Sequence, residues 1–126
     1  MSRIRSANTK PEWIVRRLLH RLGYRYRLHQ TDLPGRPDLV FRARRKVIFV
    51  NGCFWHRHDD PTCKLARMPK SRLAFWQQKL EANRQRDRVN QLALERSGWK
   101  VMVVWECELR KPDTLRERIV EFLGGA

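Results

Sequence analysis

The residues best suited to chemistry gather in one loop, which follows the apolar segment Val47–Val50. They offer thiol, imidazole and aromatic side chains: Cys53, Phe54, Trp55, His56 and His58. The irregular segment that contains them extends from Asn51 to about Lys70, and a segment of that length inside a small domain needs something to hold it. The loop therefore offers both metal ligands and a proton-transfer group.

Three cysteines and one histidine predict a structural zinc site. Three thiolates and one imidazole are a normal tetrahedral zinc complement, and the predicted ligands are Cys53, His58, Cys63 and Cys107. Zinc would pin the long loop to the sheet. The spacing is not that of a common zinc finger, and the alternative is three buried free cysteines with a surface histidine. An odd number of cysteines argues against a disulfide framework.

A second, catalytic site is predicted around Asp38, which opens a strand. A magnesium ion held by this carboxylate would polarise a phosphate, while His56 would take a proton from water. No acid or lysine stands at Phe49 or Asn51, where a neighbouring strand would present the usual partners. The magnesium site is therefore not of the usual kind, and His56 takes the place of the missing group.

Each assignment has a structural alternative. His56 could be the zinc ligand and His58 the spare histidine. Asp38 could merely cap the turn together with Arg36. Lone aspartates and histidines are common in proteins, so the residue types alone leave these alternatives open.

Glu12 is the third catalytic candidate. Its carboxylate could orient the base or a hydrated metal. A capping box with Thr9 as N-cap would explain Glu12 equally well, and both roles could hold together.

Phe54 and Trp55 stand between a predicted zinc ligand and the predicted base. Such side chains can wedge between stacked base pairs, and a mismatched pair is cheaper to open. The alternative is that both rings cover the core.

Charge and length restrict the class of protein. The 126 residues form one domain, 1–126, and the net charge of +15 favours nucleic acid as the partner. A basic surface without a specific partner is the alternative, and an anionic membrane surface is disfavoured because no helix separates an apolar from a basic face. Without a membrane span or an apolar signal segment, the protein is expected to be cytosolic.

Hydrophobic periodicity predicts the element order α-β-β-β-α-β-α. Three consecutive strands should be antiparallel neighbours, and the fourth should follow a helical crossover. The helix at 71–97 should consist of two pieces broken near Asn83. The predicted helices are 10–22, 71–97 and a last one from Pro112 to Gly124-Gly125, and the predicted strands are 24–29, 38–41, 46–50 and 99–105.

Several segments in the same order resemble the very-short-patch-repair (Vsr) endonucleases. They are Leu33-Pro34-Gly35-Arg36-Pro37-Asp38, Gly52-Cys53-Phe54-Trp55-His56-Arg57-His58, Phe75-Trp76 with Asn83 and Arg86-Asp87, and Gly98-Trp99 through Val104-Trp105-Glu106-Cys107. The resemblance covers nearly the whole chain. It implies an α/β restriction-endonuclease-like fold, a mixed sheet flanked by helices with a structural zinc site.

The resemblance also implies an activity and its residues. The expected reaction is the nicking of double-stranded DNA on the 5′ side of the thymine in a T:G mismatch, the product of 5-methylcytosine deamination. Asp38 and the backbone carbonyl of Val50 would bind Mg²⁺, His56 would be the general base and Glu12 would assist. Zn²⁺ would be bound by Cys53, His58, Cys63 and Cys107, and Phe54 and Trp55 would intercalate.

The family context further implies a bacterial, nucleoid-associated protein with mismatch-repair proteins as possible further partners. Nothing in the sequence demands a dimer, and an asymmetric mismatch suits a monomer. Candidates for contacts to the DNA backbone are Arg3, Arg5, Arg16, Arg36 and Lys70. The chain differs from some members at Asn51, where they carry a histidine; asparagine can hydrogen-bond to the phosphate but cannot carry a proton. The spacing between His58 and Cys63 is longer than in some members of the family. The segment before the first helix is shorter than the N-terminal arm of some relatives.

Two other functions are consistent with the same sequence. One is a restriction-like nuclease that cuts another lesion or an unmodified site. The other is a zinc-stabilised DNA-binding module without catalysis, for which Asp38 and His56 would be dispensable.

Overall fold

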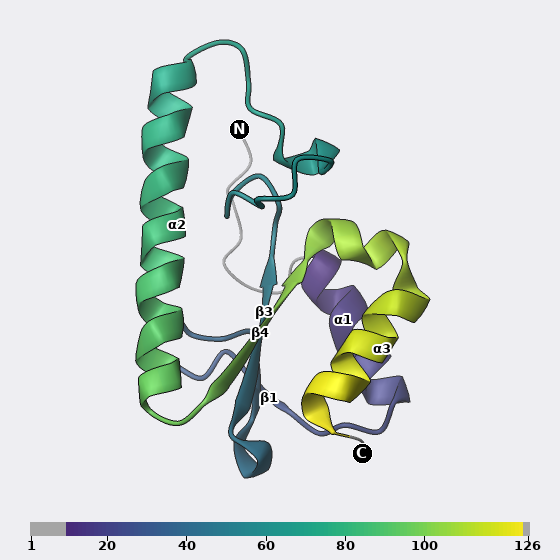
Figure 1. Ribbon diagram of the computed structural model, residues 1–126. Coiled ribbons are helices and arrows are strands. Elements are labelled where there is room, and N and C mark those ends of the chain that lie inside the picture. The colour runs from purple at the N-terminus through teal and green to yellow at the C-terminus, as the bar shows by residue number, and fades with distance from the viewer. Residues whose placement is uncertain (1–9, 125–126) are drawn as a thin grey trace.

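The computed structural model describes residues 10–124 and contains one four-stranded mixed sheet between helices (Figure 1). Its helices are α1 (Lys10–Arg21), α2 (Leu73–Arg96) and α3 (Pro112–Leu123), and its strands are β1 (Arg27–Leu28), β2 (Leu39–Phe41), β3 (Lys46–Asn51) and β4 (Lys100–Trp105). Short 3-10 turns lie at Arg42–Arg44, Lys64–Ala66 and Glu106–Arg110. The predicted α/β class and element order are confirmed.

The sheet has the order β1-β2-β3-β4. The pairing of β3 with β4 brings together the two segments that carry the predicted zinc ligands. The first three strands are antiparallel neighbours, as predicted, and β4 runs parallel to β3 after the α2 crossover. Asn51 pairs with Trp105 at the end of both strands. The loop after β3 and the turn after β4 therefore leave the sheet side by side, which brings Cys53 next to Cys107.

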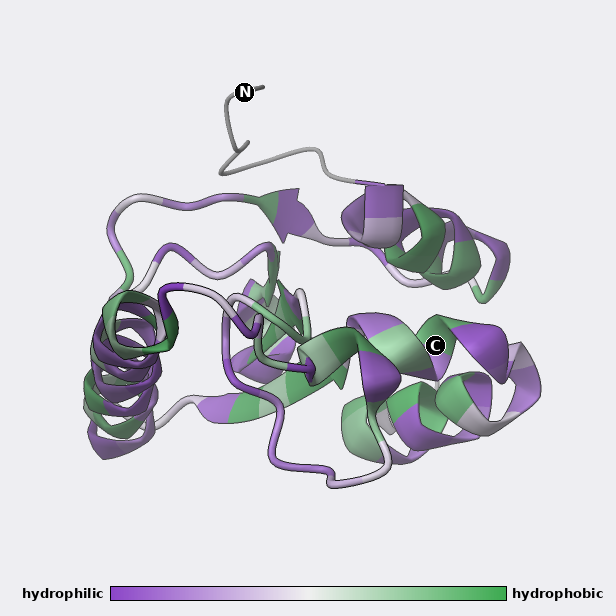
Figure 2. Cartoon of the chain, turned by 90° about the horizontal axis from the view of Figure 1, so that it is seen from above, coloured by the Kyte–Doolittle hydropathy of each residue, from purple (hydrophilic) through white to green (hydrophobic). Residues whose placement is uncertain are grey.

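Helices cover both faces of the sheet. In Figures 1 and 2, α2 lies on one face and α1 with α3 on the other. Alternate strand residues point to opposite faces, so Ile48 packs in the cluster with α1 and α3, whereas Val47 packs with Leu94 of α2. The N-terminal half of α2 extends beyond the sheet, beside the loop after β3 (Figure 1).

The prediction that α2 breaks near Asn83 is wrong, because α2 is one continuous helix of 24 residues. Its interior contains no glycine or proline and is rich in good helix formers. Asparagine is neutral to unfavourable inside a helix when its side chain competes for the local backbone. Here the Asn83 amide instead donates to the carbonyl of Trp55, 3.2 Å away in the loop.

The first strand is shorter than the predicted 24–29. Its partner β2 has only three residues, and pairing is limited to Arg27 with Val40 and Leu28 with Leu39. The next residue, His29, has a φ of +43°, which turns the chain out of the strand. Tyr24 is nevertheless buried, with its ring edge-on to Phe41 at 6.5 Å.

Some sequence expectations fall outside the described residues, among them the Thr9 cap and the Arg3 and Arg5 contacts. Between residues 10 and 124, no helix is long and apolar enough to cross a membrane.

Candidate active site

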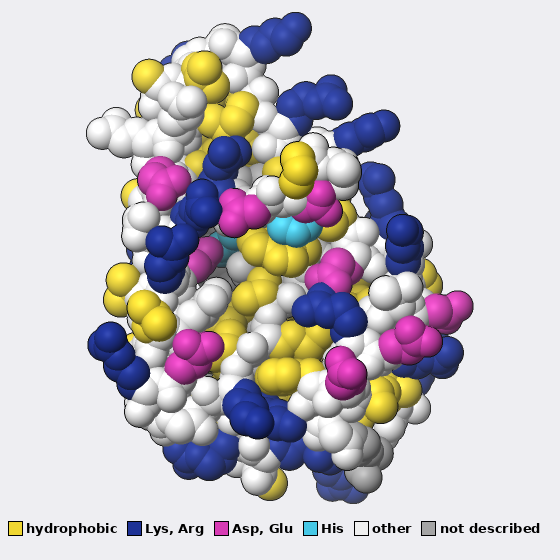
Figure 3. Space-filling model, in the orientation of Figure 1, with side chains coloured by type: hydrophobic (Ala, Val, Ile, Leu, Met, Phe, Trp, Pro, Cys, Tyr) yellow, Lys and Arg dark blue, Asp and Glu magenta, His cyan; other side chains and the backbone are white. Residues whose placement is uncertain are grey.

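A pocket of about 710 Å³ opens between the start of α1, the ends of β2 and β3, and the middle of α2. The polar and charged side chains in its wall include Glu12, His29, Asp38, Asn51, His56 and Asp87. In Figure 3 a hollow near the centre of the face has hydrophobic side chains in its floor, with a histidine and several acidic and basic side chains around it. The pocket thus gathers the predicted catalytic residues.

Asp38 lies at the end of the turn before β2, where its side chain is fixed from β3. The backbone N–H of Val50 donates to Asp38 Oδ2 at 2.7 Å. The pKa of Asp38 is raised from 3.8 to about 6, chiefly by burial; the Val50 N–H lowers it, the nearby Glu12 carboxylate raises it, and His29 and His56 lower it. This contact goes to a strand backbone, so Asp38 does more than cap the turn with Arg36.

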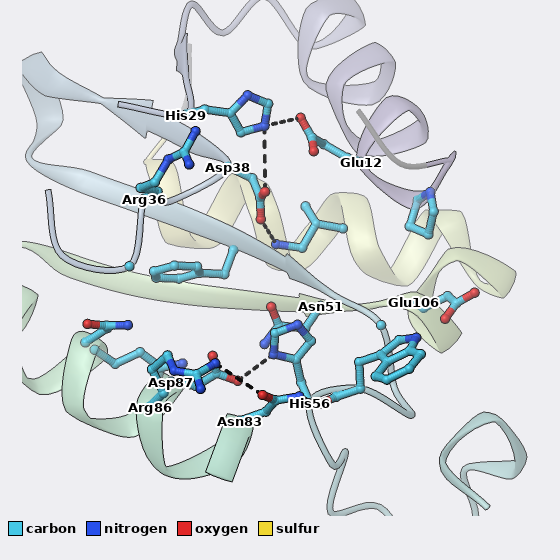
Figure 4. A pocket seen from close by; sticks show the side chains of 18 of the residues that line it. Glu12, His29, Arg36, Asp38, Asn51, His56, Asn83, Arg86, Asp87 and Glu106 are labelled. Carbon is cyan, nitrogen blue, oxygen red and sulfur yellow. Dashed lines mark hydrogen bonds and ion pairs between the residues drawn. The ribbon is translucent and has the colours of Figure 1, made fainter. Parts of the chain in front are cut away.

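Glu12 and His29 complete a cluster with Asp38. His29 Nε2 lies 2.8 Å from Glu12 Oε2 and 3.8 Å from Asp38 Oδ1 (Figure 4). Glu12 is almost fully buried, and Arg16 approaches the same Oε2 atom at 3.6 Å. These three side chains could hold a metal ion, because their donor atoms lie within 4.8 Å of one another.

His56 forms a separate pair with Asp87 of α2. His56 Nδ1 and Asp87 Oδ2 are 2.5 Å apart. One turn earlier on the same helical face, Asn83 bonds the Trp55 carbonyl, so α2 fixes both the loop backbone and the imidazole ring. Figure 4 shows this pair on one side of the pocket and the cluster of Glu12, His29 and Asp38 on the other.

The structure brings together the four predicted zinc ligands. Donor atoms of Cys53, His58, Cys63 and Cys107 all lie within 4.8 Å of one another. Cys107 Sγ is 3.5 Å from His58 Nδ1, which agrees with the separation of about 3.6 Å for tetrahedral ligands with normal zinc–sulfur and zinc–nitrogen bonds. His58 also stacks on Trp105 at 4.2 Å. This Cys3His cluster could hold a zinc, and His56 is not part of it.

Phe54 and Trp55 belong to an aromatic cluster at the N-terminal half of α2. Their rings are 5.1 Å apart, and Trp76 contacts both of them edge-on at 5.4 and 5.8 Å. Phe75 extends the cluster and is 44% exposed. Phe54 and Trp55 are half-buried and lie outside both core clusters, so they do not cover the core of the sheet.

The proposed backbone-contacting residues differ in accessibility. Arg36 is exposed at the pocket wall, and Lys70 is exposed just before α2. The Arg16 side chain is only 14% exposed, close to Glu12 and 4.3 Å from the Trp13 ring. Arg36 and Lys70 are therefore better placed than Arg16 to meet a phosphate.

Two pocket residues had no role assigned from the sequence. His29 could have been found from the predicted hairpin, because the residue after the Leu28–Leu39 pair lies across from Asp38. Asp87 could have been found from its spacing to Asn83, which puts both on one face of a continuous helix. The predicted break in α2 separated the two.

Comparisons with known proteins agree with this arrangement. Residues 1–62 match the family model described as DNA mismatch endonuclease Vsr. The chain is 53% identical to a type II nicking enzyme of Xanthomonas oryzae over 98% of this chain and 88% of the relative. It is 43% identical to a type II nicking enzyme of Neisseria meningitidis (94% and 83% covered) and 39% identical to the DNA mismatch endonuclease Vsr of Escherichia coli (99% and 81% covered).

Proposed function

This chain belongs to the Vsr family of DNA mismatch endonucleases, and we propose that it nicks double-stranded DNA at a T:G mismatch, hydrolysing the phosphodiester bond 5′ of the thymine. The observation that carries the proposal is the contact of 2.5 Å between His56 and Asp87 in the pocket that also contains Asp38. This contact gives the pocket an oriented imidazole opposite a carboxylate cluster.

His56 is the general base in this proposal. Its Nδ1–H donates to Asp87, so the Nε2 lone pair is left to accept a proton from water. Asp87 is a positioning residue that fixes the tautomer and stabilises the imidazolium formed after proton transfer. Nucleophilic attack on the phosphorus then breaks the bond to the 3′ oxygen of the preceding nucleotide.

Asp38 and the backbone carbonyl of Val50 would hold Mg²⁺, with Glu12 nearby. Oxygen donors of this kind are the ligands that magnesium prefers, and two neighbouring buried carboxylates favour a cation. When bound, Mg²⁺ would polarise the phosphate and stabilise the leaving oxygen. Asn51, which is buried at the pocket wall, can donate a hydrogen bond to a phosphate oxygen.

Zn²⁺ is the proposed occupant of the Cys3His cluster. The soft thiolate-rich donor set and the separation of 3.5 Å between Cys107 Sγ and His58 Nδ1 both fit this metal. Its role is structural, because it would fix the loop that carries Phe54, Trp55 and His56.

Phe54 and Trp55 are the proposed intercalating residues. Their support by Trp76 limits the side-chain freedom that would be lost on insertion. A T:G pair is cheaper to unstack than a matched pair, which favours binding at the mismatch. Arg36 and Lys70 would contact the DNA backbone. A monomer suits an asymmetric mismatch, and we further propose nucleoid DNA and mismatch-repair proteins as its cellular partners.

The test is incubation of the protein with Mg²⁺ and a labelled duplex that contains one T:G pair, beside its T:A counterpart. We expect one nick 5′ of the mismatched thymine and none in the T:A duplex. His56→Ala should reduce the rate by about 10²- to 10⁴-fold, the usual contribution of a general base. His20→Ala, which removes an exposed histidine of α1, should leave the rate unchanged.

Two outcomes would contradict the proposal. Equal nicking of both duplexes would indicate a nuclease for an unmodified site. Tight binding without a nick in either duplex would indicate a binding module without catalysis.

A further inference from the structure

We propose that Glu12, His29 and Asp38 form a mixed carboxylate–imidazole site for a divalent transition metal, which binds Mn²⁺ more tightly than Mg²⁺ through His29. The inference deepens the proposed nuclease function and rests on it, since Asp38 serves both. What is new is the third ligand and the ion that it selects.

The donor atoms converge at the right spacing. A metal with bonds of about 2.1 Å in octahedral geometry separates neighbouring ligand atoms by about 3.0 Å and opposite ones by about 4.2 Å. His29 Nε2 lies 2.8 Å from Glu12 Oε2 and 3.8 Å from Asp38 Oδ1, both close to this range. Figure 4 shows the imidazole directed at both carboxylates.

The environment of these three side chains favours a cation. The exposed fractions of the side chains are only 2% for Glu12 and 17% for His29 and Asp38. Two carboxylates brought together with so little solvent repel each other, and a bound cation would relieve that repulsion. Arg16 offsets part of the Glu12 charge at 3.6 Å.

The backbone holds His29 in place. Its φ of +43° lies in the left-handed region, and its N–H points at the Asp38 carbonyl at 3.4 Å. A non-glycine residue in this region carries strain that tends to persist where the side chain has a function. The hairpin therefore keeps the imidazole over Asp38 without help from a ligand.

Imidazole makes the site selective. Carboxylates and water suit both Mg²⁺ and Mn²⁺, whereas an imidazole nitrogen suits transition metals and adds little for Mg²⁺, which loses its water reluctantly. His29 should therefore strengthen binding of Mn²⁺ and leave binding of Mg²⁺ almost unchanged.

The experiment measures metal binding apart from cleavage. The Cys3His cluster of untagged protein is first filled with zinc, and Mn²⁺ binding is then followed by electron paramagnetic resonance, with Mg²⁺ as competitor. We expect one tightly bound Mn²⁺ with a pulsed-resonance coupling to a coordinated imidazole ¹⁴N. His29→Gln should remove this coupling and weaken Mn²⁺ binding at least about tenfold, with a change of less than about twofold for Mg²⁺. His20→Gln is the matched control and should behave as wild type.

Absence of the ¹⁴N coupling from the wild-type protein, or Mn²⁺ binding no tighter than that of Mg²⁺, would overturn the inference. Equal Mn²⁺ affinity of wild type and His29→Gln would also overturn it. If His29→Gln does not fold, the presence or absence of the imidazole ¹⁴N coupling in the wild-type protein decides whether the inference holds. Protein that shows the coupling but nicks no T:G duplex keeps this metal site and refutes the proposed function, whereas nicking with Mg²⁺ and no coupling refutes only this inference.

Discussion

At the scale of single residues, the burial of Asp38 lowers the stability of the folded protein when its carboxyl group is ionised. The carboxyl group is mostly buried, and burial is the main reason that its pKa rises to about 6. An ionised Asp38 is therefore unfavourable in the folded, metal-free protein, and a bound cation would reverse the penalty. The backbone N–H of Val50 donates to Asp38 Oδ2, which can accept this hydrogen bond whether the carboxyl group is ionised or protonated. The side chain therefore stays in place in both protonation states.

Replacement of Asp38 by asparagine should stabilise the metal-free protein above pH 6. Because the folded pKa of about 6 lies above the ordinary 3.8, the folded state holds this proton more tightly. The stability that protonation contributes is complete below pH 3.8 and is lost as the pH rises through about 6. The shift from 3.8 corresponds to at most about 3 kcal/mol in the free energy of unfolding.

Urea unfolding of wild type and Asp38→Asn in chelator, at pH values from 4 to 8, would measure this difference. Asp113→Asn is the control, because its side chain is 93% exposed and the substitution removes the same charge. A wild-type protein that is more stable than Asp38→Asn at pH 8 would contradict the prediction.

At the scale of elements, zinc in the Cys3His cluster would compensate for the lack of regular structure between β3 and α2. In that interval the only helical element is the short turn at Lys64–Ala66. Burial raises the pKa of Cys53 to about 12 and also raises that of Cys107. In metal-free protein both thiols are therefore protonated at neutral pH, and zinc has to displace their protons.

Substitution of His58, but not of His56, should remove zinc and destabilise this loop. His58→Ala removes a predicted ligand, so we expect loss of stoichiometric zinc and a melting temperature lower by more than about 10 °C, equivalent to a few kcal/mol for a chain of this size. His56→Ala should keep one zinc per chain, because His56 contacts Asp87 outside the cluster. Elemental analysis and thermal melting provide the two readouts; the reverse result would reassign the ligand.

At the scale of the whole molecule, the net charge and the aromatic cluster would make separable contributions to the proposed DNA binding. The net charge of +15 provides an attraction that does not depend on sequence. The cluster around Phe54 and Trp55 lies beside the pocket, and in the proposed complex it would supply contacts that depend on how easily the base pairs open. Only the first of these terms responds strongly to salt.

The salt dependence of binding should separate these terms. With six or more phosphate contacts, affinity for a T:G duplex should fall by about 10³-fold or more between 50 and 200 mM salt. Lys70→Ala should make the slope of log affinity against log salt shallower by about one unit, if Lys70 contacts a phosphate. Trp55→Ala should weaken binding to T:G without changing the slope. Fluorescence anisotropy at several salt concentrations measures both; an unchanged slope for Lys70→Ala would remove it from the interface.

The sequence by itself determined the element order, the antiparallel hairpins and the composition of the Cys3His set. These features depend on local periodicity, turn residues and ligand chemistry, all of which can be recognised in short segments of the sequence. Residue type also identified Asp38, His56 and Glu12 as candidate catalytic groups, but not His29 or Asp87.

Only the tertiary structure decided which histidine joins the cysteines and what faces Asp38. His56 meets Asp87 because a rigid α2 crosses the loop after β3, and a local pattern does not encode that crossing. His29 meets Glu12 because the β1–β2 hairpin packs against the start of α1. Contacts between distant segments arise from the packing of whole elements. The sequence therefore indicated that the loop is a candidate functional segment, but it could not fully assign the proton-transfer pair or the metal ligands.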